Sequence, residues 1–99
     1  MDIGIKIKKV KRGNARIRKG KYYITMPQWA MDRSEAYWIY YLCHELAHVT
    51  CHQLCHHFDH NDEFKMIEDV YLEDFGMTVV RCKAYPKTLT LFGKVVYRK

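Results

Sequence analysis

Residues 36–54 read AYWIYYLCHELAHVTCHQL, a run with no glycine and no proline that is apolar on nearly all sides in its first half. Such a run predicts a helix from Ala36 to about Leu54, and a helix of this kind is usually central and buried. His44, Glu45 and His48 place polar groups inside it. Because buried polar groups need partners, these side chains are the first candidates for a functional site.

The spacing of the two histidines suits a metal ion. Residues four apart on a helix lie one turn apart on nearly the same face, so His44 and His48 can reach one ion. Glu45 is rotated from His44 by about 100° and therefore lies beside the metal rather than on it. This is the His-Glu-x-x-His pattern of zinc metallopeptidases. We therefore expect a Zn²⁺ cofactor and peptide-bond hydrolysis by metal-activated water, with Glu45 as the general base.

A catalytic zinc site needs a third protein ligand and keeps its fourth position open. His52 follows on the same helix, but it lies about 12 Å from His44 along the axis and is too far away. His60 is favoured, because it opens the next helix, where a fixed backbone can aim it. The sequence leaves open two loop histidines and two carboxylates of the second helix, namely His56, His57, Glu68 and Glu73.

The segments before the central helix favour strands. Apolar residues alternate with polar ones from Ile3 onwards, and glycine-containing turns follow at 13–14 and 19–20. The strand formers of residues 22–25 precede Pro27, so the first quarter of the chain predicts a three-stranded meander. Asp32 and Glu35 then have the form of a capping box at the start of the helix.

The segments after the central helix predict a second helix and more strands. Residues 56–60 should form a loop, Asn61 should cap the second helix, and Gly76 should end it. A strand at 77–82, a break at Pro86 and a hairpin over 89–97 complete the pattern. We therefore expect a single α+β domain over residues 1–99, with two helices packed on a small, mostly antiparallel sheet.

The cysteines are Cys43, Cys51, Cys55 and Cys82, and they form no Cys-x-x-Cys pair. Cys51 and Cys55 share a helical face and could bind a metal, but such a site would need two more ligands nearby. We interpret the cysteines as buried thiols. The sequence also has no signal-peptide pattern and no apolar run long enough to span a bilayer, so we expect a cytoplasmic protein.

The net charge of +6 is unevenly distributed. Residues 1–22 carry nine Lys or Arg against one Asp, residues 81–99 carry six and no acid, and residues 32–74 carry ten acids. Basic flanks of this kind could hold nucleic acid, or could simply keep exposed strands soluble. The alternative function is therefore a nucleic-acid-binding or interaction module in which zinc only staples two helices together.

The segment His44-Glu45-Leu46-Ala47-His48, followed by His60-Asn61-Asp62-Glu63-Phe64, resembles the active-site core of the SprT-like (Spartan-type) zinc metallopeptidases. The resemblance covers roughly residues 32–76. It implies a zincin-like fold, with His44, His48 and His60 as metal ligands and Glu45 as general base. Known members act on proteins, some of them attached to DNA, which would fit the basic flanks.

Two further expectations come from resemblance. The chain is also similar to minimal gluzincins, in which the third ligand is a glutamate of the second helix, here Glu68 or Glu73. In zincins generally, an extended substrate pairs with the edge strand just before the active-site helix. By that resemblance residues 21–26 would be the substrate-binding strand.

Overall fold

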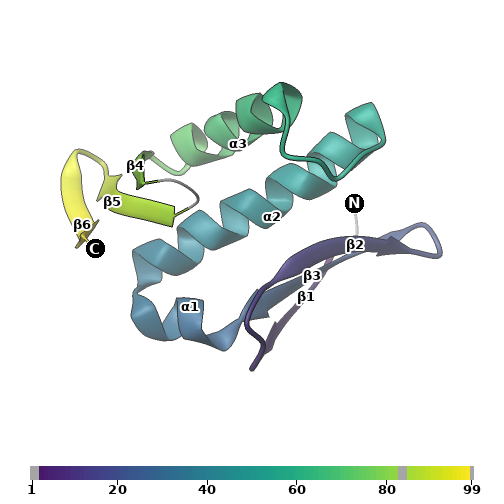
Figure 1. Ribbon diagram of the computed structural model, residues 1–99, viewed down its shortest axis with the longest axis horizontal. Coiled ribbons are helices and arrows are strands. Elements are labelled where there is room, and N and C mark those ends of the chain that lie inside the picture. The colour runs from purple at the N-terminus through teal and green to yellow at the C-terminus, as the bar shows by residue number, and fades with distance from the viewer. Residues whose placement is uncertain (1–2, 83–84, 99) are drawn as a thin grey trace.

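A computed structural model of the chain describes residues 3–82 and 85–98. A long helix, α2, runs through the middle of the molecule, with one sheet on one side and a second helix, α3, on the other (Figure 1). The second sheet lies beside the first half of α2. The elements follow in the order β1 Ile3–Lys8, β2 Asn14–Arg18, β3 Lys21–Pro27, α1 Gln28–Arg33, α2 Glu35–Cys55, α3 Asp62–Asp74, β4 Met77–Cys82, β5 Tyr85–Leu91 and β6 Lys94–Arg98.

The first sheet has the strand order β1-β3-β2, in which β3 is parallel to β1 and antiparallel to β2. The predicted meander is therefore wrong. β3 is the most buried of these strands, with Ile24 and Met26 almost inaccessible to solvent, so it takes the centre. β1 and β2 carry exposed basic side chains, which suit sheet edges.

The central place of β3 also overturns the expectation that residues 21–26 form a substrate-binding edge. Both sides of that strand are already paired, with β1 and with β2. The free edge that precedes the helices belongs to β2, which packs on α2. Alternation along a strand predicts which side chains share a face, but not which strand lies at the centre.

A short helix, α1, precedes the central helix and was not predicted from the sequence. Asp32 belongs to α1, so its predicted role as the cap of the central helix is wrong. Ser34 has extended backbone geometry, and its side chain accepts a hydrogen bond from the backbone N–H of Tyr37. The central helix therefore begins at Glu35, with Ser34 as its N-cap.

The two long helices confirm the prediction from helix periodicity and caps. Asn61 caps α3 by accepting a hydrogen bond from the N–H of Phe64, and Gly76 follows the helix with a φ of +70°. α2 and α3 pack against each other through Ala47, Cys51 and Phe64. Because Ala47 is small and fully buried, the second helix can approach the histidines closely.

The second sheet has the order β4-β5-β6 and is antiparallel throughout. The predicted hairpin is confirmed, with Phe92 and Gly93 both at positive φ in its turn. Pro86 does not break the chain, because it lies within β5 beside a register shift of β4. The α+β class is confirmed, but the strands form two separate sheets rather than one. The first sheet lies along one side of α2, and the second lies beside the first half of α2.

Among the residues that the structure describes, no helix is both long enough and apolar enough to cross a membrane.

Candidate metal centre

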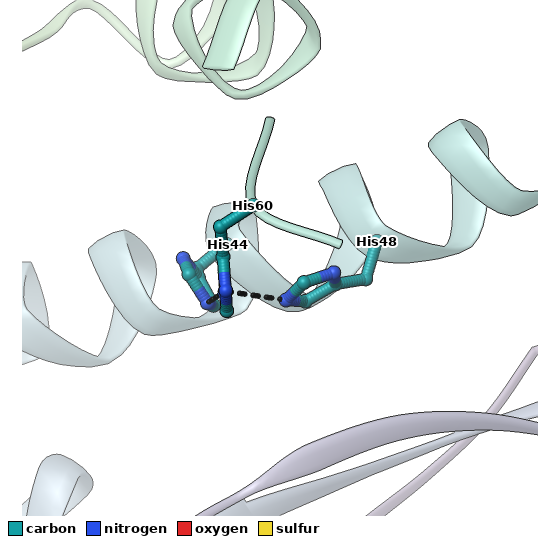
Figure 2. Close-up of side chains that lie close together, drawn as sticks. All are labelled: His44, His48 and His60. Carbon is teal, nitrogen blue, oxygen red and sulfur yellow. Dashed lines mark hydrogen bonds between the residues drawn. The ribbon is translucent and has the colours of Figure 1, made fainter. Parts of the chain in front are cut away.

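Three histidines from two parts of the chain converge between α2 and α3. The rings of His44 and His48 project from α2, and His60 reaches them from the residue before the cap of α3 (Figure 2). His60 Nε2 lies 3.0 Å from His48 Nε2 and 3.2 Å from His44 Nε2. One ligand nitrogen from each ring lies within 4.8 Å of the other two, so the group could hold a metal ion.

The donor set fits zinc in its spacing. Zinc–nitrogen bonds of about 2.0–2.1 Å at tetrahedral angles separate two ligand nitrogens by about 3.3 Å. The two measured separations, 3.0 and 3.2 Å, are close to that value. Neutral imidazoles have one proton each, and three nitrogens that point at one spot cannot all be satisfied by hydrogen bonds to one another. A metal ion would satisfy all three.

The tautomer of His44 is fixed from behind by a carboxylate. Glu68 Oε2 lies 2.6 Å from His44 Nδ1, and Arg81 donates a hydrogen bond to the other oxygen of Glu68. Nδ1 therefore carries the ring proton, and Nε2 presents its lone pair to the group. Burial alone would raise the pKa of Glu68. The hydrogen bond to His44 and the positive charge of Arg81 outweigh burial and hold this pKa below its usual value.

Glu68 is an alternative third ligand from the sequence, but it has a different place in the structure. Its carboxylate contacts the outer nitrogen of His44, whereas His60 contacts the inner one. Glu73 is exposed and lies outside the histidine group. The structure therefore brings together His44, His48 and His60, the set favoured from the sequence.

Burial keeps His48 ready to bind a cation. His48 is only 7% exposed, and burial, together with its two histidine neighbours, lowers its pKa to about 4. Burial also lowers the pKa of His60. Phe64 packs its ring against all three imidazoles, at centroid distances of 5.1 Å to His44, 4.3 Å to His48 and 4.9 Å to His60. A neutral, packed imidazole such as that of His48 loses little freedom when it binds a metal.

Glu45 lies beside the group, as its helical position requires. Its Oε1 is 3.9 Å from His44 Nε2, and the side chain is buried, which raises its pKa to about 7. In the part of the chain described, its Oε2 is one of three buried side-chain polar atoms with no hydrogen-bond partner. A carboxylate with a pKa near neutrality and a free oxygen suits proton transfer.

The remaining histidines have other surroundings. His56 is exposed and ends α2 in left-handed geometry with a φ of 62°. His52 contacts the hydroxyl of Tyr22 through Nδ1 at 2.8 Å and stacks on Phe58. His57 lies near Cys51 and Cys55, away from the histidine group. The alternatives His56 and His57 are therefore not brought to the site.

A cleft separates the histidine group from the start of β2. Arg12, Gly13, Asn14 and Ala15 line one side of this cleft, and the other side is lined by α2 and the loop before α3 through Tyr41, His44, Glu45, His48, Phe58 and His60. Gly13 donates its backbone N–H to the Tyr41 hydroxyl at 2.8 Å, which ties the two sides together. His44 also lines two neighbouring cavities, so three hollows meet at this residue.

Two parts of this site were not found by sequence reasoning. Arg81 lies on β4 and reaches Glu68 across a separation of 13 residues, and no motif marks it. Tyr41 is one of eight tyrosines, and nothing in its sequence neighbourhood distinguishes it from the others.

Comparison with known proteins gives no relative: no family model matches the chain, and searches of curated proteins and of solved structures return no significant match.

Proposed function

We propose that the chain is a small zinc-dependent endopeptidase of the His-Glu-x-x-His type, with a zincin-like arrangement that resembles the SprT-like metallopeptidases. The observation that carries the proposal is the convergence of His44, His48 and His60 with Glu45 buried beside them. Three ligands leave one coordination position open, which is typical of catalytic rather than structural zinc sites. A minimal gluzincin is disfavoured, because Glu68 occupies the far side of His44.

Each residue has a task in this proposal. His44, His48 and His60 would hold the ion, which when bound polarises the scissile carbonyl and makes water a stronger acid. Glu45 takes a proton from the attacking water and then delivers it to the leaving amine. Burial of Glu45 supports this role, since it raises the carboxylate's affinity for that proton.

The substrate would lie along β2 rather than β3. The free edge of β2 lies beside the cleft that contains Glu45 and the histidines. An extended peptide that adds to this edge gains main-chain hydrogen bonds with little dependence on its sequence. The adjoining hollow beside Tyr40 and Trp29 supplies an aromatic surface for a substrate side chain.

The test combines zinc content with casein cleavage on the purified chain. Wild type should bind zinc and cleave casein, whereas Glu45→Gln should keep the zinc and lose the cleavage. His60→Ala should lose zinc from the histidine group together with the activity. His56→Asn is the matched control, because it changes an exposed histidine outside the group in the same loop and Asn tolerates left-handed geometry.

Two results would contradict the proposal. Casein cleavage by Glu45→Gln at the wild-type rate would remove the general base from the mechanism. Failure of the reconstituted wild type to bind zinc would mean that the motif and its geometry are coincidental.

A nucleic-acid-binding role is the second candidate, and the charge of the first sheet favours it. All nine Lys and Arg residues between positions 6 and 21 are exposed, and Arg12 lies at the rim of the cleft. A surface of this kind attracts polyanions, and substrates bound to nucleic acid would be held near the site. Fluorescence anisotropy with labelled DNA should show binding that weakens steeply with salt, and the absence of binding at low salt would exclude this role.

A further inference from the structure

A second group of metal-binding side chains lies at the end of α2. Cys51 and Cys55 project from the last turns of the helix, and His57 follows in the loop. One ligand atom from each of these residues lies within 4.8 Å of the others. The first turn of α3 adds a carboxylate, because Glu63 contacts both Cys55 and His57. These are the two further ligands that a site built on Cys51 and Cys55 requires.

Two of the spacings among these atoms are close to those of a zinc site. Tetrahedral zinc separates a sulfur from a nitrogen ligand by about 3.6 Å and a nitrogen from an oxygen ligand by about 3.4 Å. Cys51 Sγ lies 3.6 Å from His57 Nε2, and His57 Nε2 lies 3.4 Å from Glu63 Oε1. The pair Cys55 Sγ and Glu63 Oε2 is closer, at 2.8 Å, because the thiol donates a hydrogen bond to the carboxylate.

Three local adjustments would accompany metal binding. The Glu63 side chain is 58% exposed and can retreat from Cys55 once the thiol proton is lost. His57 Nδ1 accepts the backbone N–H of Asp59 at 3.1 Å, and this contact must open if Nε2 is to bind the ion. Asp59 is exposed, so water can take over its N–H. Asn61 Nδ2 lies 3.1 Å from His57 Nε2 and 3.4 Å from Glu63 Oε1, so this exposed amide must also move away from the ligand atoms. The three changes are confined to side chains and one loop peptide.

The second group is separate from the histidine centre. His44 and His48 correspond to Cys51 and Cys55 after a shift of seven residues, about two helical turns, so both pairs face α3. The shift corresponds to about 10 Å along the helix axis. Paired catalytic metals lie about 3.5–4 Å apart, so the two groups would hold independent ions.

We propose that Cys51, Cys55, His57 and Glu63 form a second, structural zinc site that joins the end of α2 to the loop and the first turn of α3. Four protein ligands close the coordination sphere, which is the structural kind of site. Two thiolates favour zinc over magnesium or calcium.

The second site has a consequence for the proposed catalytic centre. His57 and Glu63 lie on either side of His60 in the chain, so an ion that binds both of them holds the segment that delivers the third histidine. Ligands of the two groups therefore alternate along residues 57–63, because His60 of the histidine group stands between His57 and Glu63 of the second group. This consequence rests on the proposed function, whereas the existence of the second site does not.

The test counts zinc ions in the full chain by native mass spectrometry after reconstitution. Wild type should bind a second equivalent of zinc, and Cys55→Ser should lose one equivalent. Cys43→Ala is the matched control, because Cys43 is buried in a different core cluster and should not affect the count. His57→Asn changes a loop ligand and should reproduce the Cys55→Ser result if that variant does not fold.

Cobalt substitution separates the two centres. Thiolate-to-cobalt charge-transfer absorption should appear in wild type and in His60→Ala, and should vanish in Cys55→Ser. A wild type that binds one metal without thiolate absorption would overturn the second site and leave the histidine centre intact. A Cys51–Cys55 disulfide in the zinc-reconstituted protein would overturn it as well. Two bound zinc ions without casein cleavage would support the second site while contradicting the proposed function.

The effect on His60 is measured separately. Cys55→Ser should weaken zinc binding at the histidine centre by about 10–100-fold in chelator competition, the range found for residues that orient metal ligands. An unchanged affinity would overturn the positioning role.

Discussion

Glu68 Oε2 lies 2.6 Å from His44 Nδ1, so a carboxylate on one helix orients a histidine on the other. The same carboxylate receives a hydrogen bond from Arg81 on β4. α2, α3 and the second sheet are therefore joined behind the metal-binding face of His44. This arrangement holds the ring in the tautomer that a metal requires, before any ion arrives.

Removing Glu68 should therefore weaken metal binding without removing a ligand. We expect Glu68→Ala to lower zinc affinity by about 10–100-fold, because His44 loses the partner that fixes its tautomer and ring orientation. Chelator competition measures the affinity, and circular dichroism checks that the helices remain. Glu73→Ala on the exposed side of the same helix is the control and should bind zinc as wild type does. Equal affinities in the two variants would show that Glu68 has no part in the site.

Burial of Glu45 should make the metal-free protein sensitive to pH. Burial raises its pKa from 4.5 to about 7, so the folded state disfavours the ionised form. Below pH 4.5 the carboxyl is protonated in both the folded and unfolded states, and its contribution is constant. As the pH rises from 4.5 to 7, the unfolded chain ionises first and the folded state loses stability.

The corresponding variant, Glu45→Gln, cannot ionise. We therefore expect it to gain stability relative to wild type as the pH rises through that window, when both proteins are free of metal. His48, whose lowered pKa acts in the opposite direction, is present in both proteins and cancels in the comparison. Thermal denaturation at pH 4 and pH 8 with a chelator measures the difference. Glu73→Gln, an exposed control, should show the same change of stability with pH as wild type. If the stability difference between Glu45→Gln and wild type does not change with pH, burial does not raise the pKa of Glu45 in the folded protein.

Local signals predicted much of this structure, and the failures at β3 and Glu68 concern long-range arrangement. Asn61 and Gly76 mark the ends of α3 because capping and left-handed geometry depend on adjacent residues. The spacing of His44 and His48 fixes their relation for the same reason. The central place of β3 depends on competition among three strands for burial, and the role of Glu68 depends on a contact 24 residues away. Neither leaves a periodic trace in the sequence.

The start of α2 should depend on Ser34 and not on Asp32. Ser34 Oγ accepts the backbone N–H of Tyr37 at 3.0 Å, so Ser34→Ala should lower the free energy of unfolding by about 1 kcal/mol. Asp32 accepts an exposed hydrogen bond from Gln28, so Asp32→Ala should change the stability by less than about 0.5 kcal/mol. Urea denaturation of both variants makes the comparison. A larger loss in Asp32→Ala would restore the capping box expected from the sequence.

Gly13 is the residue at which the cleft least tolerates a side chain. A Cβ there would lie 2.3 Å from the carbonyl oxygen of Thr25 and 2.8 Å from the ring of Tyr41. A backbone oxygen in a paired strand cannot move aside, so the segment before β2 would have to shift and lose its hydrogen bond to Tyr41. We expect Gly13→Ala to lower the free energy of unfolding by about 1–3 kcal/mol, as overpacking usually does.

The same shift should alter the cleft, because Gly13 lines it together with Glu45. Casein cleavage by Gly13→Ala should therefore fall even at temperatures where the variant is fully folded, while its zinc content stays at the wild-type level. Gly4→Ala is the matched control, since a Cβ at Gly4 approaches only the side chain of Tyr23, at 3.0 Å, and that ring can move. If Gly13→Ala and Gly4→Ala lose stability and activity to the same extent, the close approach at Gly13 does not shape the cleft.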